Sequence, residues 1–147
     1  MIDRYDGEYA FLSNYSTSPF KDEYNDFYPT MEHYFQAQKA TNSYDFELVR
    51  KAKTPGLAKK YGRQIKIAPD WESVKVDVMR KGLHFKFAIP ELRYKLLATG
   101  DQYLEEGNTW HDNYWGNCNC PKCVDILGRN TLGQLLMEIR EEIKNNI

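Results

Sequence analysis

The segment spanning residues 27–39 constrains the fold most, because it marks where a helix begins and which side chains that helix presents together. Pro29 favours an extended approach, Thr30 can cap the first helical amides with its hydroxyl, and no glycine or proline follows before residue 40. These signals predict a helix of roughly three turns. Glu32, Gln36 and Lys39 then recur at the spacing that places side chains on one helical face.

This polar face has two interpretations. Glu32 lies in the first turn, where the helix dipole favours an ionised carboxylate, and the Lys39 amine about two turns later could steady that charge or react itself. The same pattern also suits a solvated amphipathic helix that carries a charge pair. The helix alone does not choose between them.

Helical patterns dominate the rest of the chain. We expect helices over 43–53, 55–62, 71–87, 90–99 and 130–145. The start of the chain, where Tyr9, Phe11 and Tyr15 partly alternate, predicts a short strand and a loop. Residues 63–67 predict an extended linker or edge strand. Residues 103–128 predict a loop-rich segment. The fold class that follows is mainly α with minor β elements, in a single compact domain over residues 1–147.

Composition excludes several classes of protein. The 147 residues include 20 basic and 21 acidic side chains, so no global positive field attracts DNA or an anionic membrane. A local basic patch would suffice for nucleic acid, and the sequence offers one at Lys51, Lys53, Lys59, Lys60, Arg63 and Lys66, which a solvated helix face explains equally well. The N-terminus lacks an apolar signal core and no segment is apolar enough to span a bilayer, so we expect a cytoplasmic protein with no membrane partner.

Several sequence blocks together resemble one known family. They are Gly7 to Tyr15, Ser18 to Phe20, Tyr28 to Lys39, Trp71 to Phe87, Trp115-Gly116 and Asn130 to Arg140. In this order they resemble the NADAR (NAD and ADP-ribose) superfamily, which includes the N-glycosidases that act on intermediates of riboflavin biosynthesis. The resemblance covers nearly the whole chain and implies cleavage of a bond between a ribose C1′ and a base nitrogen.

Such a bond breaks through an oxocarbenium-like state, so the site must stabilise positive charge on the sugar and negative charge on the leaving base. Glu32 is the first candidate for the carboxylate near C1′. Lys39 could attack C1′ of a ring-opened sugar to form an imine, or act as an electrostatic partner. Asp112, which precedes Trp115-Gly116 as the resemblance implies for an acidic residue, could share acid/base work or bind a ribose hydroxyl, or be a turn aspartate.

Substrate binding has further candidates. Phe11, Trp71 and Trp115 could stack on a base, although Trp71 opens an apolar helical stripe and is equally suited to the core. Asn14 could hold a sugar hydroxyl or a base edge, or satisfy a turn. For a phosphate the candidates are Lys86 and the segment 59–63.

Three histidines have structural alternatives to a chemical role. His33 and His111 could carry protons, but a hydrogen-bonded structural role suits each of them as well. We expect His84, which lies in the apolar stripe, to be packed rather than to act as a base.

The three cysteines are clustered and odd in number, which is unlike a secreted disulfide framework. Cys118, Cys120 and Cys123 have the spacing of soft-metal sites, and His111 could complete a tetrahedral zinc set of structural type. The alternative is three reduced thiols in a surface loop. Catalysis itself requires no cofactor in this reading.

The expected function is an N-glycosidase that acts on phosphoribosylamino-pyrimidine intermediates of riboflavin biosynthesis, which makes a small phosphorylated ribosyl-base compound the partner. One alternative is an ADP-ribosyl hydrolase that removes ADP-ribose from nucleobases, including guanine in DNA, with nucleic acid as part of the substrate. Another is a module that binds ADP-ribose or a nucleotide without catalysis. Replacement of Glu32 and Lys39 separates these, because binding could survive it and turnover should not.

Overall fold

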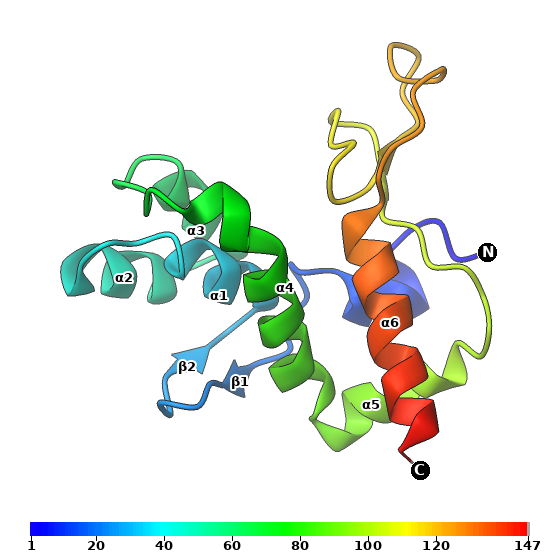
Figure 1. Ribbon diagram of the computed structural model, residues 1–147, viewed down its shortest axis with the longest axis horizontal. Coiled ribbons are helices and arrows are strands. Elements are labelled where there is room, and N and C mark those ends of the chain that lie inside the picture. Colours follow the sequence, from blue (N-terminus) through cyan, green and yellow to red (C-terminus); the bar gives the residue numbers. More distant parts are fainter. Residues whose placement is uncertain (147) are drawn as a thin grey trace. The chain divides into compact units, whose positions relative to one another are not determined.

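The computed structural model describes residues 1–146, whose elements are labelled in chain order in Figure 1. The chain divides into two compact units: Asn14–Ile89 forms one, and Met1–Ser13 together with the chain from Pro90 onward forms the other.

The unit of residues 14–89 consists of four helices and a hairpin. The elements are β1 (Phe20–Lys21), β2 (Phe27–Tyr28), α1 (Met31–Ala37), α2 (Ser43–Arg50), α3 (Pro55–Gly62) and α4 (Trp71–Phe87). The two strands pair antiparallel, with Phe20 opposite Tyr28. Helix α1 contacts α2, α3 and α4, and all seven of its residues are buried. The predicted polar face of α1 is therefore inside the unit.

Side-chain caps set the starts of three helices. Thr30 Oγ1 accepts a hydrogen bond from the His33 amide, Asn42 Oδ1 accepts one from the Asp45 amide, and Thr54 Oγ1 accepts one from the Leu57 amide. Each cap satisfies an amide that has no partner within its own helix. The predicted cap at Thr30 is confirmed.

Helix α1 is shorter than the sequence predicts. It has 7 residues and ends at Ala37, so Lys39 lies in the turn that follows instead of on a third helical turn. The reason is a tertiary pairing: the Ala68 amide donates to the Lys39 carbonyl at 2.9 Å, and Ala40 forms an antiparallel bridge with Ile67. The predicted extended character of residues 63–67 contributes to this bridge.

An aromatic cluster forms part of the core of this unit. The Phe20 ring lies 5.7 Å from both Tyr28 and Tyr34, and Tyr34 lies 6.2 Å from Phe85, measured between centroids. Gly82 allows α4 to approach this cluster, because a Cβ there would overlap the Tyr34 ring.

Helix α4 buries most of its predicted stripe but not its histidine. Trp71, Met79 and Leu83 are buried as expected. His84 is exposed, with its Nδ1 at 2.9 Å from the Arg80 carbonyl, so the expectation of a packed histidine was wrong. The helix turns by about 100° per residue, so His84 lies on the side of α4 opposite the buried Met79 and Leu83.

The other unit contains η1 (Gly7–Leu12), α5 (Pro90–Ala98), β3 (Gly107–Asn108), β4 (Asn117–Cys118) and α6 (Thr131–Asn145). The prediction of a strand near Tyr9 and Phe11 was wrong, because η1 is a 3-10 helix. Hydrogen bonds from Tyr9 to Asp6 and from Ser13 to Ala10 close its turns.

Helices α5 and α6 pack together, with the buried Arg140 Nη1 donating to Thr99 Oγ1 at 2.9 Å. The inward positions predicted for α6, at Leu132, Leu135, Leu136 and Ile139, are all buried. Between the helices, 103–128 is loop-rich as expected and contains the two-residue strands β3 and β4, which pair in parallel.

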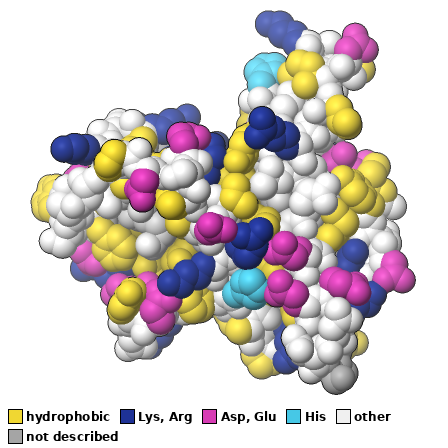
Figure 2. Space-filling view, in the orientation of Figure 1, with side chains coloured by type: hydrophobic (Ala, Val, Ile, Leu, Met, Phe, Trp, Pro, Cys, Tyr) yellow, Lys and Arg dark blue, Asp and Glu magenta, His cyan; other side chains and the backbone are white. Residues whose placement is uncertain are grey.

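The expected fold class, mainly α with minor β elements, is confirmed. Within residues 1–146, no helix has the length and apolarity to cross a membrane. Figure 2 shows basic and acidic side chains interspersed over the visible face, consistent with the near-neutral net charge.

Candidate active site

Glu32 is a buried carboxylate at the start of α1, with only 7% of its surface exposed. Gln36 lies one turn later on the same helix, and its Nε2 donates to Glu32 Oε1 at 2.7 Å. The Glu32 amide donates to the Asn14 carbonyl at 3.0 Å, which fixes the chain before the hairpin against the first turn of α1. The helical spacing therefore holds this carboxylate in a defined orientation.

Lys39 extends over two aromatic rings after the end of α1. Its Nζ lies 5.9 Å from the centroid of Phe35 and 5.8 Å from the centroid of Trp71. The two rings are themselves 5.1 Å apart and inclined at 57°. Such contacts favour a cation through the electron density of the rings.

Burial lowers the pKa of the Lys39 amine below its ordinary value, because the charged form loses water. The Glu32 carboxylate opposes this effect by raising the pKa, whereas the positive charges of Arg63 and Lys59 lower it further. A lysine in these surroundings is closer to the neutral form needed for nucleophilic attack than a solvated lysine is.

Tyr15 and Arg63 also belong to this electrostatic environment. Burial and the Glu32 charge raise the pKa of the Tyr15 hydroxyl, and Arg63 opposes them. We name Asn14, Tyr15, Glu32, Gln36, Lys39 and Arg63 the α1 cluster. It combines a carboxylate, an amine, a guanidinium and two amides within one unit.

Two amide oxygens of the α1 cluster have capacity to bind a ligand. Asn14 Oδ1 and Gln36 Oε1 are buried and have no hydrogen-bond partner within residues 1–146. The Asn14 amide nitrogen lies 3.6 Å from Met79 Sδ, so its oxygen faces another direction. A ligand hydroxyl or amine could donate to such an oxygen and remove the cost of leaving it unpaired.

Gly62 lets α3 approach the α1 cluster. A Cβ at this position would overlap the Gln36 side-chain amide, including the unpartnered Oε1. Gly62 is the last residue of α3, and its lack of a side chain leaves space for Gln36 to reach Glu32. The sequence predicted that α3 ends here but not this second role.

His33 is buried and held by two hydrogen-bonding contacts. The His33 ring nitrogens lie 2.8 Å from Thr30 Oγ1 and 2.8 Å from the Ala52 carbonyl, which is the structural role considered for it. Burial lowers the pKa of His33.

Lys86 is fully buried, with its Nζ 5.2 Å from the Phe87 ring, and burial lowers its pKa to about 7. The predicted role of Lys86 toward a phosphate stays a prediction.

A shallow hollow lies elsewhere in the same unit, between α2 and α3. Tyr44, Leu48, Leu57 and Tyr61 are among the residues that line it. None of the predicted site residues contributes to its lining, and we do not assign the chemistry to it.

The remaining predicted substrate residues lie in the other unit. Asp112 Oδ1 accepts from the amides of Tyr114 at 3.1 Å and Trp115 at 2.9 Å, which makes it a turn aspartate in addition to any chemical role. The Trp115 ring lies 4.9 Å from the Tyr114 ring, and the Phe11 ring lies 5.9 Å from Lys95 Nζ. Their roles toward a substrate stay predictions.

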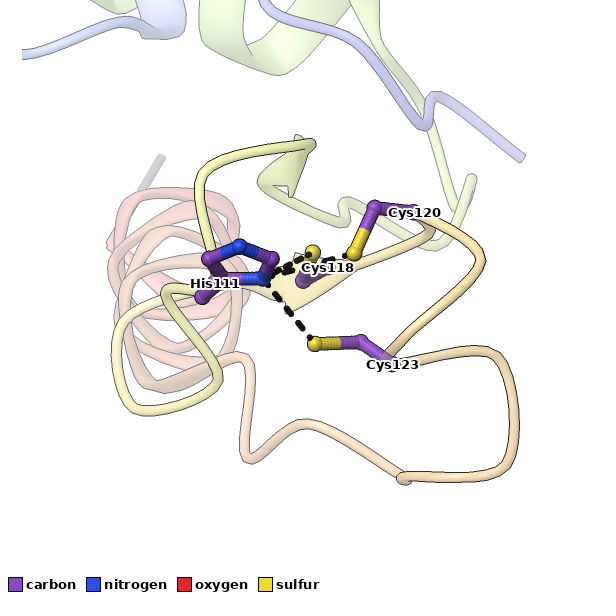
Figure 3. Close-up of side chains that lie close together, drawn as sticks. All are labelled: His111, Cys118, Cys120 and Cys123. Carbon is purple, nitrogen blue, oxygen red and sulfur yellow. Dashed lines mark hydrogen bonds between the residues drawn. The ribbon is translucent and has the colours of Figure 1, made fainter.

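The structure also brings together the four predicted metal ligands. His111 Nδ1 lies 3.3 Å from Cys120 Sγ, 3.4 Å from Cys123 Sγ and 3.9 Å from Cys118 Sγ (Figure 3). We name these four residues the thiol cluster. Asp112, next to His111 in sequence, belongs to the same loop.

Sequence reasoning underestimated two members of the α1 cluster. The sequence placed Tyr15 in an alternating segment and in a block shared with the family, and Arg63 in a basic segment proposed for phosphate, but predicted neither next to Glu32. The usable signal was indirect: α3 ends at Gly62, so Arg63 lies directly after its end. Which element the end of α3 meets is decided by packing alone.

Known proteins resemble this chain over nearly its whole length. The family model for the NADAR domain matches residues 2–144. The N-glycosidase YbiA of Escherichia coli (strain K12) is 42% identical over 139 residues, which cover 92% of this chain and 82% of that protein. The chloroplastic riboflavin biosynthesis protein PYRR of Zea mays is 35% identical over 153 residues, covering 92% of this chain and 24% of that protein.

A solved structure agrees with the fold. The NMR structure of the E. coli protein YbiA superimposes with a TM-score of 0.82 at 37% sequence identity, covering 99% of this chain and 88% of the other. The similarity therefore extends to both units.

Proposed function

This chain belongs to the NADAR domain family, and we propose that it is an N-glycosidase that hydrolyses the ribosyl-base bond of phosphoribosylamino-pyrimidine intermediates of riboflavin biosynthesis. The expected class, an N-glycosidase, is confirmed by a relative of that name at 42% identity. The riboflavin biosynthesis protein of maize supports the choice of substrate.

The observation that carries the proposal is the state of Glu32. Its carboxylate is buried, receives a hydrogen bond from Gln36, and lies in the same electrostatic environment as Lys39. A solvated amphipathic helix, the alternative interpretation of this segment, would leave these groups in water. A buried carboxylate beside a partly desolvated amine is instead typical of functional sites.

Glu32 can serve the reaction in either of two ways. As the bond from C1′ to the base nitrogen lengthens, positive charge grows on the ribose, and a carboxylate held near C1′ stabilises it. Alternatively Glu32 accepts a proton from a water molecule while the water oxygen bonds to C1′. In both cases the bond electrons leave with the base nitrogen, which takes up a proton.

Lys39 has a covalent and an electrostatic role open to it. In the covalent role its neutral amine attacks C1′ of the ring-opened sugar, the base leaves with a proton, and water later hydrolyses the imine. In the electrostatic role its cation pairs with Glu32 or with a phosphate. The lowered pKa supports the first role and the contacts with Phe35 and Trp71 support the second.

A small phosphorylated ribosyl compound suits the other groups of the α1 cluster. Arg63 supplies a guanidinium, which pairs with phosphate through two parallel hydrogen bonds. Asn14 Oδ1 supplies an acceptor for a sugar hydroxyl. The ring centroids of Trp71 and Phe35 lie 5.8 Å and 5.9 Å from the amine.

The test is a direct comparison of substrates. The purified protein is incubated with a phosphoribosylamino-pyrimidine and, separately, with DNA that carries ADP-ribosylated guanine, and the released base and sugar are measured by mass spectrometry. We expect release from the pyrimidine compound and release slower by roughly 10²-fold or more with the Glu32→Gln variant. The exposed Glu91, which pairs with Lys95 on α5, provides a matched control as Glu91→Gln.

Three other outcomes would replace the proposal. Release only from the DNA substrate would assign the protein to the ADP-ribosyl hydrolases. Binding of either compound without release, unchanged in Glu32→Gln, would assign it to binding modules without catalysis. Equal turnover by wild type and Glu32→Gln would remove Glu32 from the mechanism.

A further inference from the structure

The thiol cluster has the composition and the spacing of a metal site that the proposed hydrolysis does not use. Its Nδ1 and three Sγ atoms all lie within 4.8 Å of one another. Figure 3 shows the imidazole and the three sulfur atoms directed at one common point. The three cysteines lie within six residues, and His111, seven residues before Cys118, joins them from an earlier part of the loop between β3 and α6.

The distances from the imidazole nitrogen to the sulfur atoms fit the first coordination shell of one tetrahedral ion. With Zn–S bonds of about 2.3 Å and a Zn–N bond of about 2.0 Å, a tetrahedral site separates nitrogen from each sulfur by about 3.5 Å. The observed separations of 3.3, 3.4 and 3.9 Å lie on both sides of that value. A multi-iron cluster would hold its ligands further apart, because metal-metal distances add to the span.

The backbone around the cysteines presents the sulfur atoms toward one side. Cys118 belongs to β4, where its amide donates to Asn113 Oδ1 at 2.8 Å. The Cys123 amide donates to the Cys120 carbonyl at 3.0 Å, which closes a turn with Pro121 at its second position. The turn and the strand together bring three sulfur atoms to one place without a disulfide.

His111 reaches the sulfur atoms from an uncommon backbone conformation. Its φ is 70°, in the left-handed region that side chains with a Cβ rarely adopt. Residues held in such conformations cost of order 1–3 kcal/mol unless surrounding interactions compensate. Coordination by Nδ1 is an interaction of sufficient strength, whereas a hydrogen bond to a thiol is weak.

We propose that His111, Cys118, Cys120 and Cys123 bind one zinc ion that fixes the loop between β3 and α6. Three thiolates and one neutral imidazole select soft or borderline divalent ions over magnesium and calcium, which prefer oxygen ligands. Four protein ligands leave no open position for substrate or water, so the ion is structural.

Backbone hydrogen bonds already support the loop, for example from the Asn117 amide to the Glu106 carbonyl and from the Thr131 amide to the Tyr114 carbonyl. Strands β3 and β4 have two residues each, and Asp112 and Asn113 stabilise it through side-chain hydrogen bonds to backbone amides. A metal would tie the positions before and after these residues together. Because Asp112 and Trp115 lie in this loop, its order also bears on residues that the family resemblance relates to the substrate.

The first test measures metal directly. Protein prepared without chelators and without a histidine tag is analysed for zinc by mass spectrometry, and we expect about one zinc per chain. Replacement of zinc by Co²⁺ should give the intense visible absorption of tetrahedral cobalt and a near-ultraviolet charge-transfer band from thiolate. Metal removal should lower the melting temperature, because coordination contributes to folding.

Matched variants then identify the ligands. Cys120→Ser combined with Cys123→Ser should reduce bound zinc at least tenfold and abolish the charge-transfer band. Lys122→Ala changes an exposed residue of the same turn and should leave both readouts unchanged. His111→Asn keeps a residue that tolerates positive φ and removes the imidazole, so it should weaken Co²⁺ binding at least tenfold while leaving the charge-transfer band in place.

Clear results would overturn the proposal. One is wild-type protein with far less than one zinc per chain that also fails to show the thiolate band with Co²⁺. A second is protein whose intact mass shows two thiols lost to a disulfide. A third is His111→Asn with wild-type affinity and spectrum, which would remove the histidine from the ligand set. None of these readouts depends on glycosidase activity, so failure here is separate from failure of the proposed function.

Discussion

The α1 cluster and the thiol cluster contrast in what holds their side chains. Glu32 and Gln36 lie one turn apart on a helix whose residues are all buried, so regular backbone and packing orient them. The thiol cluster lies in a loop with two-residue strands and a histidine at positive φ. Helical packing orients the first site, whereas for the second we propose a metal ion as an additional link between loop residues. Variants that remove one support at a time test this contrast.

The largest effect is expected at Glu32. Glu32→Gln keeps the shape of the side chain and loses its charge, so we expect the rate of glycosidic cleavage to fall by roughly 10²-fold or more while ligand affinity changes little. Single-turnover kinetics and equilibrium binding measure the two quantities separately. A fall in affinity with an unchanged rate would mean that Glu32 only holds the ligand.

The next largest effect is expected at Lys39, where two variants distinguish the covalent role from the electrostatic role. Lys39→Met removes both charge and nucleophile and should lower the rate by roughly 10²-fold, and Lys39→Arg restores only the charge. If the amine forms an imine, Arg gives no recovery, and borohydride added during turnover traps a sugar remnant on wild-type Lys39. Recovery of most activity in Lys39→Arg, without a trapped adduct, would establish the electrostatic role.

Asp112 tests whether the loop contributes charge or only shape. Asp112→Asn retains an acceptor for the Tyr114 and Trp115 amides, and Asp112→Ala does not. We expect Asn to keep the melting temperature and lower the rate by about 10-fold, and Ala to lower both. Full activity in Asp112→Asn would leave Asp112 as a turn residue alone. Thermal unfolding and initial rates are the measurements.

The smallest expected effect concerns the packing of α3. Gly62→Ala places a Cβ against the Gln36 amide and should lower the free energy of unfolding by about 1–3 kcal/mol and loosen the bond from Gln36 to Glu32. Gly56→Ala in the same helix is the control, because its Cβ would meet only Thr54 Oγ1 at 4.0 Å. Denaturant unfolding measures both variants, and equal stabilities would show that Gln36 adjusts freely.

The sequence by itself determined the local features of this protein. The cap at Thr30, the proline start and glycine end of α3, and the buried face of α6 depend on residues within a few positions of one another. The position of Glu32 in the first turn of α1 also depends only on nearby residues. So does the spacing of the three cysteines. Each was predicted because short-range sterics and hydrogen bonding decide it.

Only the tertiary structure decided the rest. Helix α1 ends at Ala37 because the chain after it pairs with residues 67 and 68, and Lys39 meets Trp71 because of that pairing. The burial of Lys86, the exposure of His84 and the approach of α3 to Gln36 likewise depend on which elements pack together. Contacts between distant residues depend on the shape and packing of whole elements, which no short stretch of sequence contains.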